Sequence, residues 1–89
     1  MNYFMYILKS KAIDRFYIGQ TSNLKSRIKR HNSGDMFSTK PYGPWKIIYF
    51  ETFPTRSEAM KRERYLKSPA GWKELQIIKQ HYGSNEILL

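Results

Sequence analysis

The sequence predicts an α+β fold, a small three-stranded antiparallel sheet packed with helices in the order β-β-α-β-α-α. Two runs of aromatic and aliphatic residues, 3–8 and 14–19, are separated by a few polar residues, which is typical of an antiparallel hairpin. A third strand-like run, 45–53, ends at Pro54. Segments with helical apolar spacing follow the second and third runs. This alternation is typical of one sheet covered by helices.

Length and composition favour one small domain with a polyanionic partner. The 89 residues can bury an adequate but not deep core, and the absence of cysteine excludes disulfides and thiolate metal sites. No signal peptide is recognisable and no apolar run approaches the roughly 20 residues that span a bilayer, so we expect a soluble cytoplasmic protein. Sixteen Lys and Arg against seven Asp and Glu give a net charge of +9. Nucleic acid is favoured over a membrane, because no basic amphipathic helix with bulky apolar residues is evident.

The predicted hairpin joins a strand at residues 3–8 to one at residues 14–19. The first run is apolar enough for a strand covered on both faces. With a turn centred near residue 12, Tyr6 and Tyr17 are expected to lie close to opposite each other. A slip of one residue would turn one of them to the other face of the sheet.

A helix is predicted to begin near Asn23, because Ser22 or Asn23 can cap its first turn. It is expected to end at residues 32–35. There Asn32 or Gly34 can adopt the left-handed conformation that closes a helix. Residues 36–44, rich in Ser, Thr, Pro and Gly, are predicted to form a loop.

One face of this helix combines apolar and polar side chains. Arg27 and His31 follow Leu24 by three and seven positions, so both lie on or beside the stripe that Leu24 and Ile28 define. A purely structural interpretation leaves Arg27 at the edge of the stripe with its head in water, and lets His31 favour the dipole at the end of the helix. The outer faces carry Lys25, Ser26, Lys29 and Arg30.

The third strand is expected at residues 45–53, inside the sheet. Alternation places Trp45, Ile47 and Tyr49 on one face and Lys46, Ile48 and Phe50 on the other. Residues 55–58 have the spacing of a capping box and begin a second helix that continues through Leu66. After a break at residues 68–71, a last helix spans residues 72–82, with Trp72, Leu75, Ile78 and Tyr82 at helical spacing. We expect one domain over residues 1–83 and a frayed tail over residues 84–89.

The second helix carries an acidic residue on its inward stripe. Glu63 lies between Ala59 and Leu66 at helical spacing, so its carboxylate is expected to face the core. Because a buried charge needs a partner, Glu63 either pairs with a basic side chain such as Arg27 or has a metal-binding or catalytic role.

Together these residues resemble the GIY-YIG nuclease family, over roughly residues 3–80. The matching segments are Tyr6-Ile7-Leu8, Tyr17-Ile18-Gly19, the helix of residues 23–31 and Glu63 within residues 58–67. The chain is similar above all to small stand-alone members and to the N-terminal catalytic domain of excision-repair nucleases. It departs from the family where Phe4-Met5 precede Tyr6 in place of Gly-Ile. It also lacks a clear match, after Leu66, to an asparagine found in several relatives.

The resemblance implies divalent-metal-dependent hydrolysis of DNA phosphodiester bonds. Glu63 would be the only protein ligand of Mg²⁺, with Mn²⁺ as a substitute, since one carboxylate plus waters suits this ion. The resemblance also assigns the remaining roles: Tyr6 takes a proton from the attacking water, Tyr17 hydrogen-bonds the water or the phosphate, Arg27 clamps the phosphate, and His31 accepts or relays the proton of Tyr6. No small-molecule cofactor is implied.

The expected substrate is duplex or branched DNA, of the kind handled in DNA repair. The basic residues expected to contact its backbone are Lys25, Lys29, Arg30, Lys40 and Arg62. Since no sequence-reading module is recognisable, specificity is expected to depend on DNA structure or on a separate protein. Two alternatives remain: a non-catalytic nucleic-acid-binding module that retains the fold, and an interaction domain whose basic charge is incidental.

Overall fold

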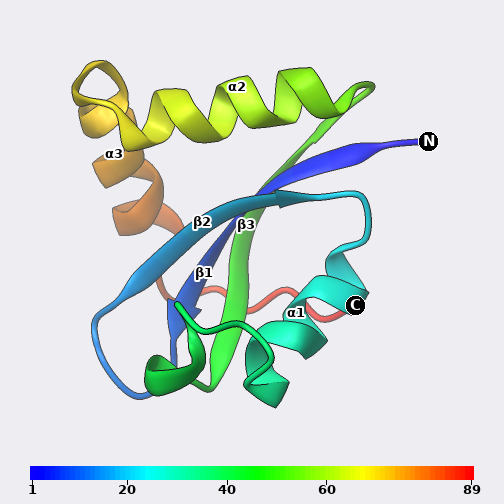
Figure 1. Cartoon of the computed structure of the whole chain (residues 1–89). Coiled ribbons are helices and arrows are strands. Elements are labelled where there is room, and N and C mark those ends of the chain that lie inside the picture. Colours follow the sequence, from blue (N-terminus) through cyan, green and yellow to red (C-terminus); the bar gives the residue numbers. More distant parts are fainter.

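The computed structural model describes all 89 residues and confirms the predicted α+β class and element order (Figure 1). Three strands, three α-helices and two short 3-10 helices follow one another along the chain. They are β1 (Tyr3–Ser10), β2 (Phe16–Thr21), α1 (Leu24–Ser33), a 3-10 helix (Lys40–Tyr42), β3 (Trp45–Phe53), α2 (Arg56–Lys67), a 3-10 helix (Pro69–Gly71) and α3 (Trp72–Tyr82). The first 3-10 helix interrupts the predicted loop of residues 36–44. None of the helices combines the length and the apolar character that crossing a membrane requires.

The sheet has the order β2-β1-β3, with both pairs antiparallel. The expectation that the third strand lies inside the sheet is therefore wrong, because β1 is central and β3 is an edge strand. The apolar run of β1 explains this order: Met5, Ile7 and Leu8 are fully buried, so both faces of the strand are covered.

The hairpin register differs from the predicted one by two residues. Tyr6 lies opposite Gly19 and Leu8 lies opposite Tyr17. The cause is the position of the turn, which lies at residues 11–15, after Ser10. The Ser10 hydroxyl accepts hydrogen bonds from the amides of the residues two and three positions later, at 3.0 and 3.1 Å. Because the slip is two residues, Tyr6 and Tyr17 still share one face of the sheet.

A β-bulge in β3 breaks the predicted alternation of its side chains. Ile7 pairs with Tyr49 and Leu8 pairs with Ile47, so Ile48 is an extra residue on this strand. As a result Ile48 and Tyr49 both face the α2–α3 side of the sheet. Phe50 then returns to the α1 side, where it joins the cluster that contains Ile47.

Helices cover both faces of the sheet (Figure 1). On one face, α2 and α3 contribute Leu66, Leu75 and Ile78 to a core with Met5 and Ile7 of the central strand. On the other face, α1 contributes Leu24 and Ile28 to a second cluster, which also contains Tyr6, Leu8, Tyr17, Trp45 and Ile47. The candidate site residues of β1 and β2 thus lie on the α1 side of the sheet.

The predicted helix caps are present. The Asn23 side chain accepts a hydrogen bond from the Ser26 amide at 3.0 Å, and Gly34 ends α1 with a φ of 84°. The Thr55 hydroxyl accepts a hydrogen bond from the Glu58 amide at the start of α2. These local signals therefore set the position of α1, which carries the arginine and histidine of interest.

The C-terminal segment, residues 84–89, differs from the frayed tail that we expected. It has no regular secondary structure, but the Ile87 amide donates a hydrogen bond to the Ile47 carbonyl at 2.8 Å. The Asn85 side chain lies 3.5 Å from the carbonyl oxygen of Ile48. The segment thus lies against the outer edge of β3, where it pairs with backbone groups that an edge strand leaves open. Asn85 is at the opposite edge of the sheet from β2.

Candidate active site

The centre of the site is a hydrogen bond between two buried side chains. Tyr6 lies on β1 and His31 on α1, and each is 1% exposed. The Tyr6 hydroxyl lies 2.9 Å from His31 Nε2. The two residues are 25 positions apart in sequence, so the packing of α1 on the sheet brings them together.

The environment of His31 keeps its imidazole neutral. Burial, together with the positive charges of Arg27 and Arg30, lowers the pKa of His31 to about 4. The structural interpretation, in which a charged imidazole favours the α1 dipole, does not describe this neutral group. At neutral pH one ring nitrogen is therefore a free acceptor.

Thr39 orients the imidazole, and sequence reasoning missed this residue. Its hydroxyl lies 2.9 Å from His31 Nδ1 and 3.4 Å from the Met36 carbonyl oxygen. If the hydroxyl donates to that carbonyl, its oxygen accepts from Nδ1–H, and Nε2 is left to accept the proton of Tyr6. The only signal in the sequence was a threonine within a polar loop, which is too common to single out. Indole Nε1 of Trp45 donates to the Thr39 carbonyl at 2.9 Å and so holds the loop in place.

Tyr6 keeps its proton at neutral pH. Burial raises the pKa of Tyr6 well above its usual value of 10.0, and the charges of Tyr17 and Glu63 act in the same direction, while that of Arg27 opposes them. The positive charge expected to activate Tyr6 is thus present in Arg27, but burial has the larger effect. Tyr6 can accept a proton from another group only as it passes its own to His31.

Gly19 is required by the position of the Tyr6 ring. It lies opposite Tyr6 in the register, and a Cβ atom there would lie 2.6 Å from the Tyr6 hydroxyl oxygen. The neighbouring Tyr17 ring packs 4.8 Å from the His31 ring and 6.3 Å from the Tyr6 ring, measured between centroids. In the second tyrosine motif, Tyr17 thus places its ring beside the imidazole, and Gly19 leaves room for the ring of Tyr6.

Glu63 faces the same site from α2. Its side chain is 22% exposed, and its Oε2 atom accepts a hydrogen bond from Lys67 Nζ at 2.7 Å. The charge partner is therefore Lys67, one helical turn along, and not Arg27 as the structural interpretation suggested. Lys67 Nζ also lies 5.9 Å from the centroid of the Tyr17 ring, which links this ion pair to the tyrosines.

The chemistry of the donor set decides which metal could bind. The structure brings together no group of three or more His, Cys, Asp or Glu side chains. Glu63 offers one carboxylate, and its Oε1 atom has no protein hydrogen-bond partner. Such a site fits a hard cation that takes a single carboxylate and fills its other positions with water and phosphate oxygens, as Mg²⁺ does. It does not fit an ion that needs several nitrogen or sulfur ligands.

Arg27 is half-buried on α1, close enough to Tyr6 and His31 to lower the pKa of both. The site therefore contains one fixed positive charge beside the tyrosine–histidine pair and one carboxylate on the opposite helix. A phosphodiester group carries negative charge and would be attracted to the guanidinium, which offers several donors in one plane.

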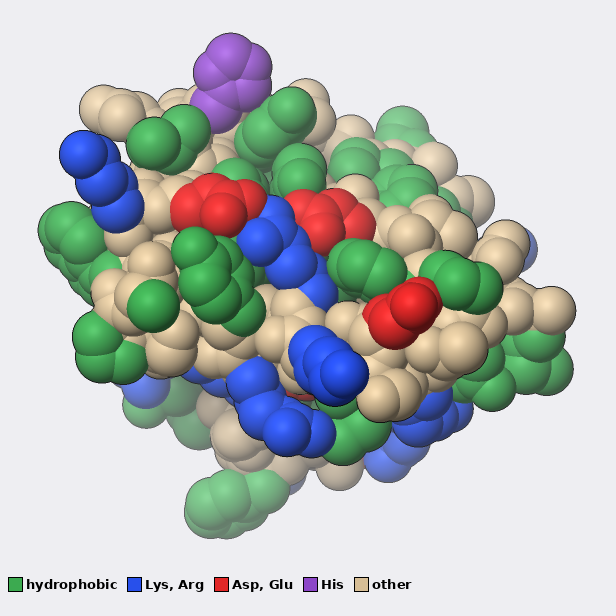
Figure 2. Space-filling view, turned by 90° about the horizontal axis from the view of Figure 1, so that it is seen from above, with side chains coloured by type: hydrophobic (Ala, Val, Ile, Leu, Met, Phe, Trp, Pro, Cys, Tyr) green, Lys and Arg blue, Asp and Glu red, His purple; other side chains and the backbone are tan.

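Four of the five residues predicted to contact DNA are exposed, and the fifth is held in ion pairs. Those on α1 and at the following 3-10 helix are exposed: Lys25, Lys29, Arg30 and Lys40. Arg62 is not available, since its side chain is 22% exposed, contacts Glu74 and donates to Glu51 at 2.8 and 3.0 Å. Figure 2 shows acidic side chains among the Lys and Arg on the face over α2. The prediction for Arg62 is wrong because the sequence pattern of α2 does not reveal its ion-pair partners, which come from β3 and α3.

The neutral state of His31 has a consequence for stability. Between pH 6.5 and about 4 the unfolded chain binds a proton at His31 that the folded chain does not, so stability falls as pH falls through this window. The expected loss is at most roughly 3 kcal/mol, at about 1.4 kcal/mol per pKa unit. Denaturant unfolding at several pH values measures it. The change between pH 7 and 5 should shrink in a His31→Asn variant and persist in His81→Asn, which alters the exposed second histidine. An unchanged pH dependence in His31→Asn would contradict this account.

Comparison with known proteins finds relatives that match nearly the whole chain. The family model described as "GIY-YIG catalytic domain" matches residues 2–74, which include all five candidate site residues. A UPF0213 protein of Clostridium perfringens is 46% identical over 79 residues, covering 88% of this chain and 83% of the relative. The UPF0213 protein YazA of Bacillus subtilis is 36% identical over 86 residues, covering 96% and 86% of the two chains. The solution NMR structure of a UPF0213 protein from Bacillus halodurans has a TM-score of 0.55 at 33% identity, covering 94% of this chain and 89% of that one.

Proposed function

Because this chain belongs to the GIY-YIG family of nuclease domains, we propose that it is an endonuclease that hydrolyses DNA phosphodiester bonds with the help of one Mg²⁺ ion, for which Mn²⁺ substitutes. The observation that carries the proposal is the buried Tyr6–His31 hydrogen bond of 2.9 Å with Glu63 close enough to affect the pKa of Tyr6. Packing of the core does not by itself require a protonated tyrosine and a neutral imidazole to lie beside a carboxylate that has one oxygen free of protein partners.

The Tyr6–His31 pair supplies the path for the proton of the attacking water. Since Tyr6 is protonated at neutral pH, it accepts the water's proton as its own hydroxyl proton moves to His31 Nε2. The imidazole becomes doubly protonated for this step. Its Nδ1–H bond to Thr39 keeps the ring in the orientation that receives the proton.

Glu63 would hold the metal through its carboxylate. When bound, the ion supplies charge stabilisation for the phosphate and its leaving oxygen. Lys67 competes for the same carboxylate, since its Nζ atom lies 2.7 Å from Oε2. Lys67 is 48% exposed, so it can turn away into solvent at little cost when the ion binds.

Arg27 and Tyr17 position the scissile phosphate. The guanidinium of Arg27 faces the same cluster as the Tyr6 hydroxyl and offers paired donors to two phosphate oxygens. The Tyr17 hydroxyl completes the hydrogen bonds to the water or the phosphate. Neither residue transfers a proton in this scheme.

The substrate is DNA whose backbone lies along the exposed basic side of α1. The residues of this surface contact phosphates and carry no sequence information directly, so we propose that specificity depends on DNA structure or on a separate protein. The contacting residues are Lys25, Lys29, Arg30 and Lys40. Arg62 is not proposed as a contact, because Glu51 and Glu74 occupy its guanidinium.

The test is incubation of the protein with supercoiled plasmid and with nicked, flapped and branched oligonucleotides in the presence of Mg²⁺ or Mn²⁺. We expect nicked or linear plasmid, or defined cuts in at least one branched substrate, and no cutting by a Tyr6→Phe variant. If no substrate is cut although the protein binds DNA, the non-catalytic binding module is the better description.

Binding should depend steeply on salt. The slope of log affinity against log salt concentration is about −0.9 per neutralised phosphate on duplex DNA, and a domain of this size can contact roughly four to six phosphates. We therefore expect a slope between about −3 and −5 for a Glu63→Gln protein, measured by fluorescence anisotropy. Random duplexes of equal length should bind alike.

The basic side of α1 should account for most of this slope. Replacing Lys25, Lys29 and Arg30 together by glutamine should remove about three phosphate contacts and so make the slope less negative by roughly 2.7. Arg62→Gln is the comparison, because its paired guanidinium should leave the slope unchanged while the protein melts at a lower temperature. A flat salt response in the starting protein would contradict the proposal of a nucleic-acid surface.

A further inference from the structure

An open groove lies on the face of β2 opposite the candidate active site. It is lined by Lys9, Phe16, Trp72, Gln76 and Lys79, with Asp14 as its one acidic residue. Phe16 and Tyr17 are neighbours on β2, so their side chains point to opposite faces of the sheet. Phe16 packs on the α2–α3 side and Tyr17 on the α1 side. β2 is an edge strand of the sheet (Figure 1). The groove and the active site therefore lie on the two faces of the same free edge.

Two lysines are held over the ring of Phe16. Lys79 Nζ lies 4.7 Å from the ring centroid and Lys9 Nζ lies 5.5 Å from it. A half-buried aromatic ring thus brings two ammonium groups from different elements, β1 and α3, to one place. Neither lysine has a carboxylate partner within salt-bridge distance, so both are free to meet an anion.

Trp72 is the large aromatic side chain that the fold leaves exposed beside these lysines. The helical spacing of α3 predicts an inward tryptophan, and Leu75 and Ile78 are indeed buried, but Trp72 is 62% exposed. The turn before it is closely fixed, since a Cβ atom at Gly71 would lie 2.1 Å from the Tyr65 carbonyl oxygen. The turn between α2 and α3 therefore holds the indole at the rim of the groove and out of the core.

We propose that this groove binds single-stranded DNA, with a base stacked on Trp72 and the backbone contacted by Lys9 and Lys79. Exposed aromatic faces combined with a basic groove are the features that bind single strands, because only there are base faces open to stacking. Duplex DNA hides those faces. The proposal rests on the proposed function for its ligand class, a nucleic acid, and it adds the form of that nucleic acid and its position on the molecule.

The placement connects the groove with the cutting site. Lys67, on the last turn of α2, contributes a positive charge 5.9 Å from the ring of Tyr17, the β2 residue next to Phe16 of the groove. A single strand leaving a branch or flap at the active site can pass this edge and reach the groove. A substrate with a single-stranded arm would then bind more tightly than a plain duplex.

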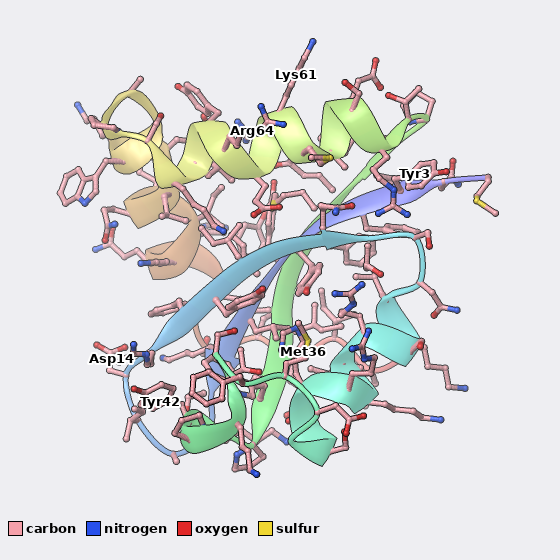
Figure 3. The ribbon with its side chains drawn as sticks, in the orientation of Figure 1. Tyr3, Asp14, Met36, Tyr42, Lys61 and Arg64 are labelled. Atoms are coloured by element: carbon pink, nitrogen blue, oxygen red, sulfur yellow. The ribbon has the colours of Figure 1, made fainter.

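The test uses binding of labelled oligothymidine, measured by anisotropy without metal. Trp72→Ala should weaken binding about fivefold or more, the loss expected for one stacked base, and should leave duplex affinity nearly unchanged. The matched control is Phe37→Ala, which removes an aromatic side chain that is 95% exposed outside the groove. Lys79→Gln should reduce the salt slope by about 0.7, whereas Lys61→Gln should not, since Lys61 points away from the sheet (Figure 3).

Tryptophan fluorescence provides a second readout. Trp45 is 2% exposed and Trp72 is exposed, so quenching by oligothymidine should come from Trp72 and disappear in Trp72→Phe. Oligothymidine binding that is unchanged in Trp72→Ala, without quenching in the starting protein, would overturn the groove proposal even if the protein cuts DNA. Binding that depends on Trp72 in a protein that cuts nothing would support the groove and contradict the proposed function.

Discussion

Replacing Glu63 by glutamine should abolish cleavage while leaving the fold and DNA binding intact. The carboxylate is proposed to hold the metal, whose charge stabilisation is worth several kcal/mol, so the rate should fall by about 10³-fold or more. The only ion pair that the substitution removes is the one with Lys67, a partly exposed pair one helical turn apart. Such pairs contribute about 0.3–0.5 kcal/mol, so the melting temperature should hardly change. The measurements are single-turnover cleavage, DNA anisotropy and a melting curve on the same preparation.

Glu58→Gln is the control for Glu63→Gln. Glu58 is an exposed carboxylate in the first turn of the same helix, so its loss changes the net charge equally and leaves the site untouched. It should cut at the normal rate. A large fall in the melting temperature of Glu63→Gln would instead indicate that Glu63 mainly neutralises a buried positive charge, and would count against the metal role.

Replacing Tyr6 by phenylalanine should cost far more rate than stability. The variant keeps the ring packing but lacks the hydroxyl that passes the water's proton to His31, and such proton transfer is worth about 10²–10⁴-fold. It also leaves His31 Nε2 buried without a partner, at a cost of about 1–3 kcal/mol in unfolding free energy. The variant should remain folded despite this loss of unfolding free energy, and circular dichroism can verify that it does.

Tyr49→Phe is the control for Tyr6→Phe. The Tyr49 hydroxyl donates a hydrogen bond to Glu51 at 2.6 Å on the other side of the sheet, and burial together with Glu51 raises the pKa of Tyr49 to about 12. This variant also loses one tyrosine hydrogen bond, but it should cut normally. Near-normal cleavage by Tyr6→Phe would transfer the proton-accepting role to Tyr17, and Tyr17→Phe would then be the decisive variant.

The elements that carry local signals could be predicted from the sequence. Asn23 and Gly34 bound α1, Thr55 begins α2, and Pro54 follows β3, because each of these residues determines the backbone beside it. The position of His31 on the inward face of α1 follows from the helical repeat alone. For this reason the residue types of the candidate site were recognisable before their distances were known.

Features that depend on pairing between distant segments could not be predicted. The bulge at Ile48 and the edge position of β3 result from how three strands meet, and nothing within the strand marks them. The same is true of Arg62, whose partners Glu51 and Glu74 come from other elements. Thr39 orients His31 from a loop eight residues further along the chain. Because a loop has no regular repeat of side-chain directions, the sequence pattern does not predict this contact.

The burial of Tyr6 also changes the chemistry in a way that sequence could not show. From residue types alone, a nearby positive charge is enough to prepare a tyrosine for proton acceptance. In the structure Tyr6 is 1% exposed, and burial raises its pKa in spite of Arg27. The neutral imidazole of His31 therefore has to take part, which makes His31 as important to the proposed reaction as Tyr6.

Metal dependence of strand cleavage by the unaltered protein tests the central claim most directly. The protein is treated with a chelator, freed of it, and incubated with its best DNA substrate while Mg²⁺ is added back stepwise. The account predicts no cleavage without the ion, recovery as Mg²⁺ is restored, and equal or greater recovery with Mn²⁺. Cleavage that continues in the chelator would contradict it, because a single carboxylate at Glu63 would then have no ion to hold.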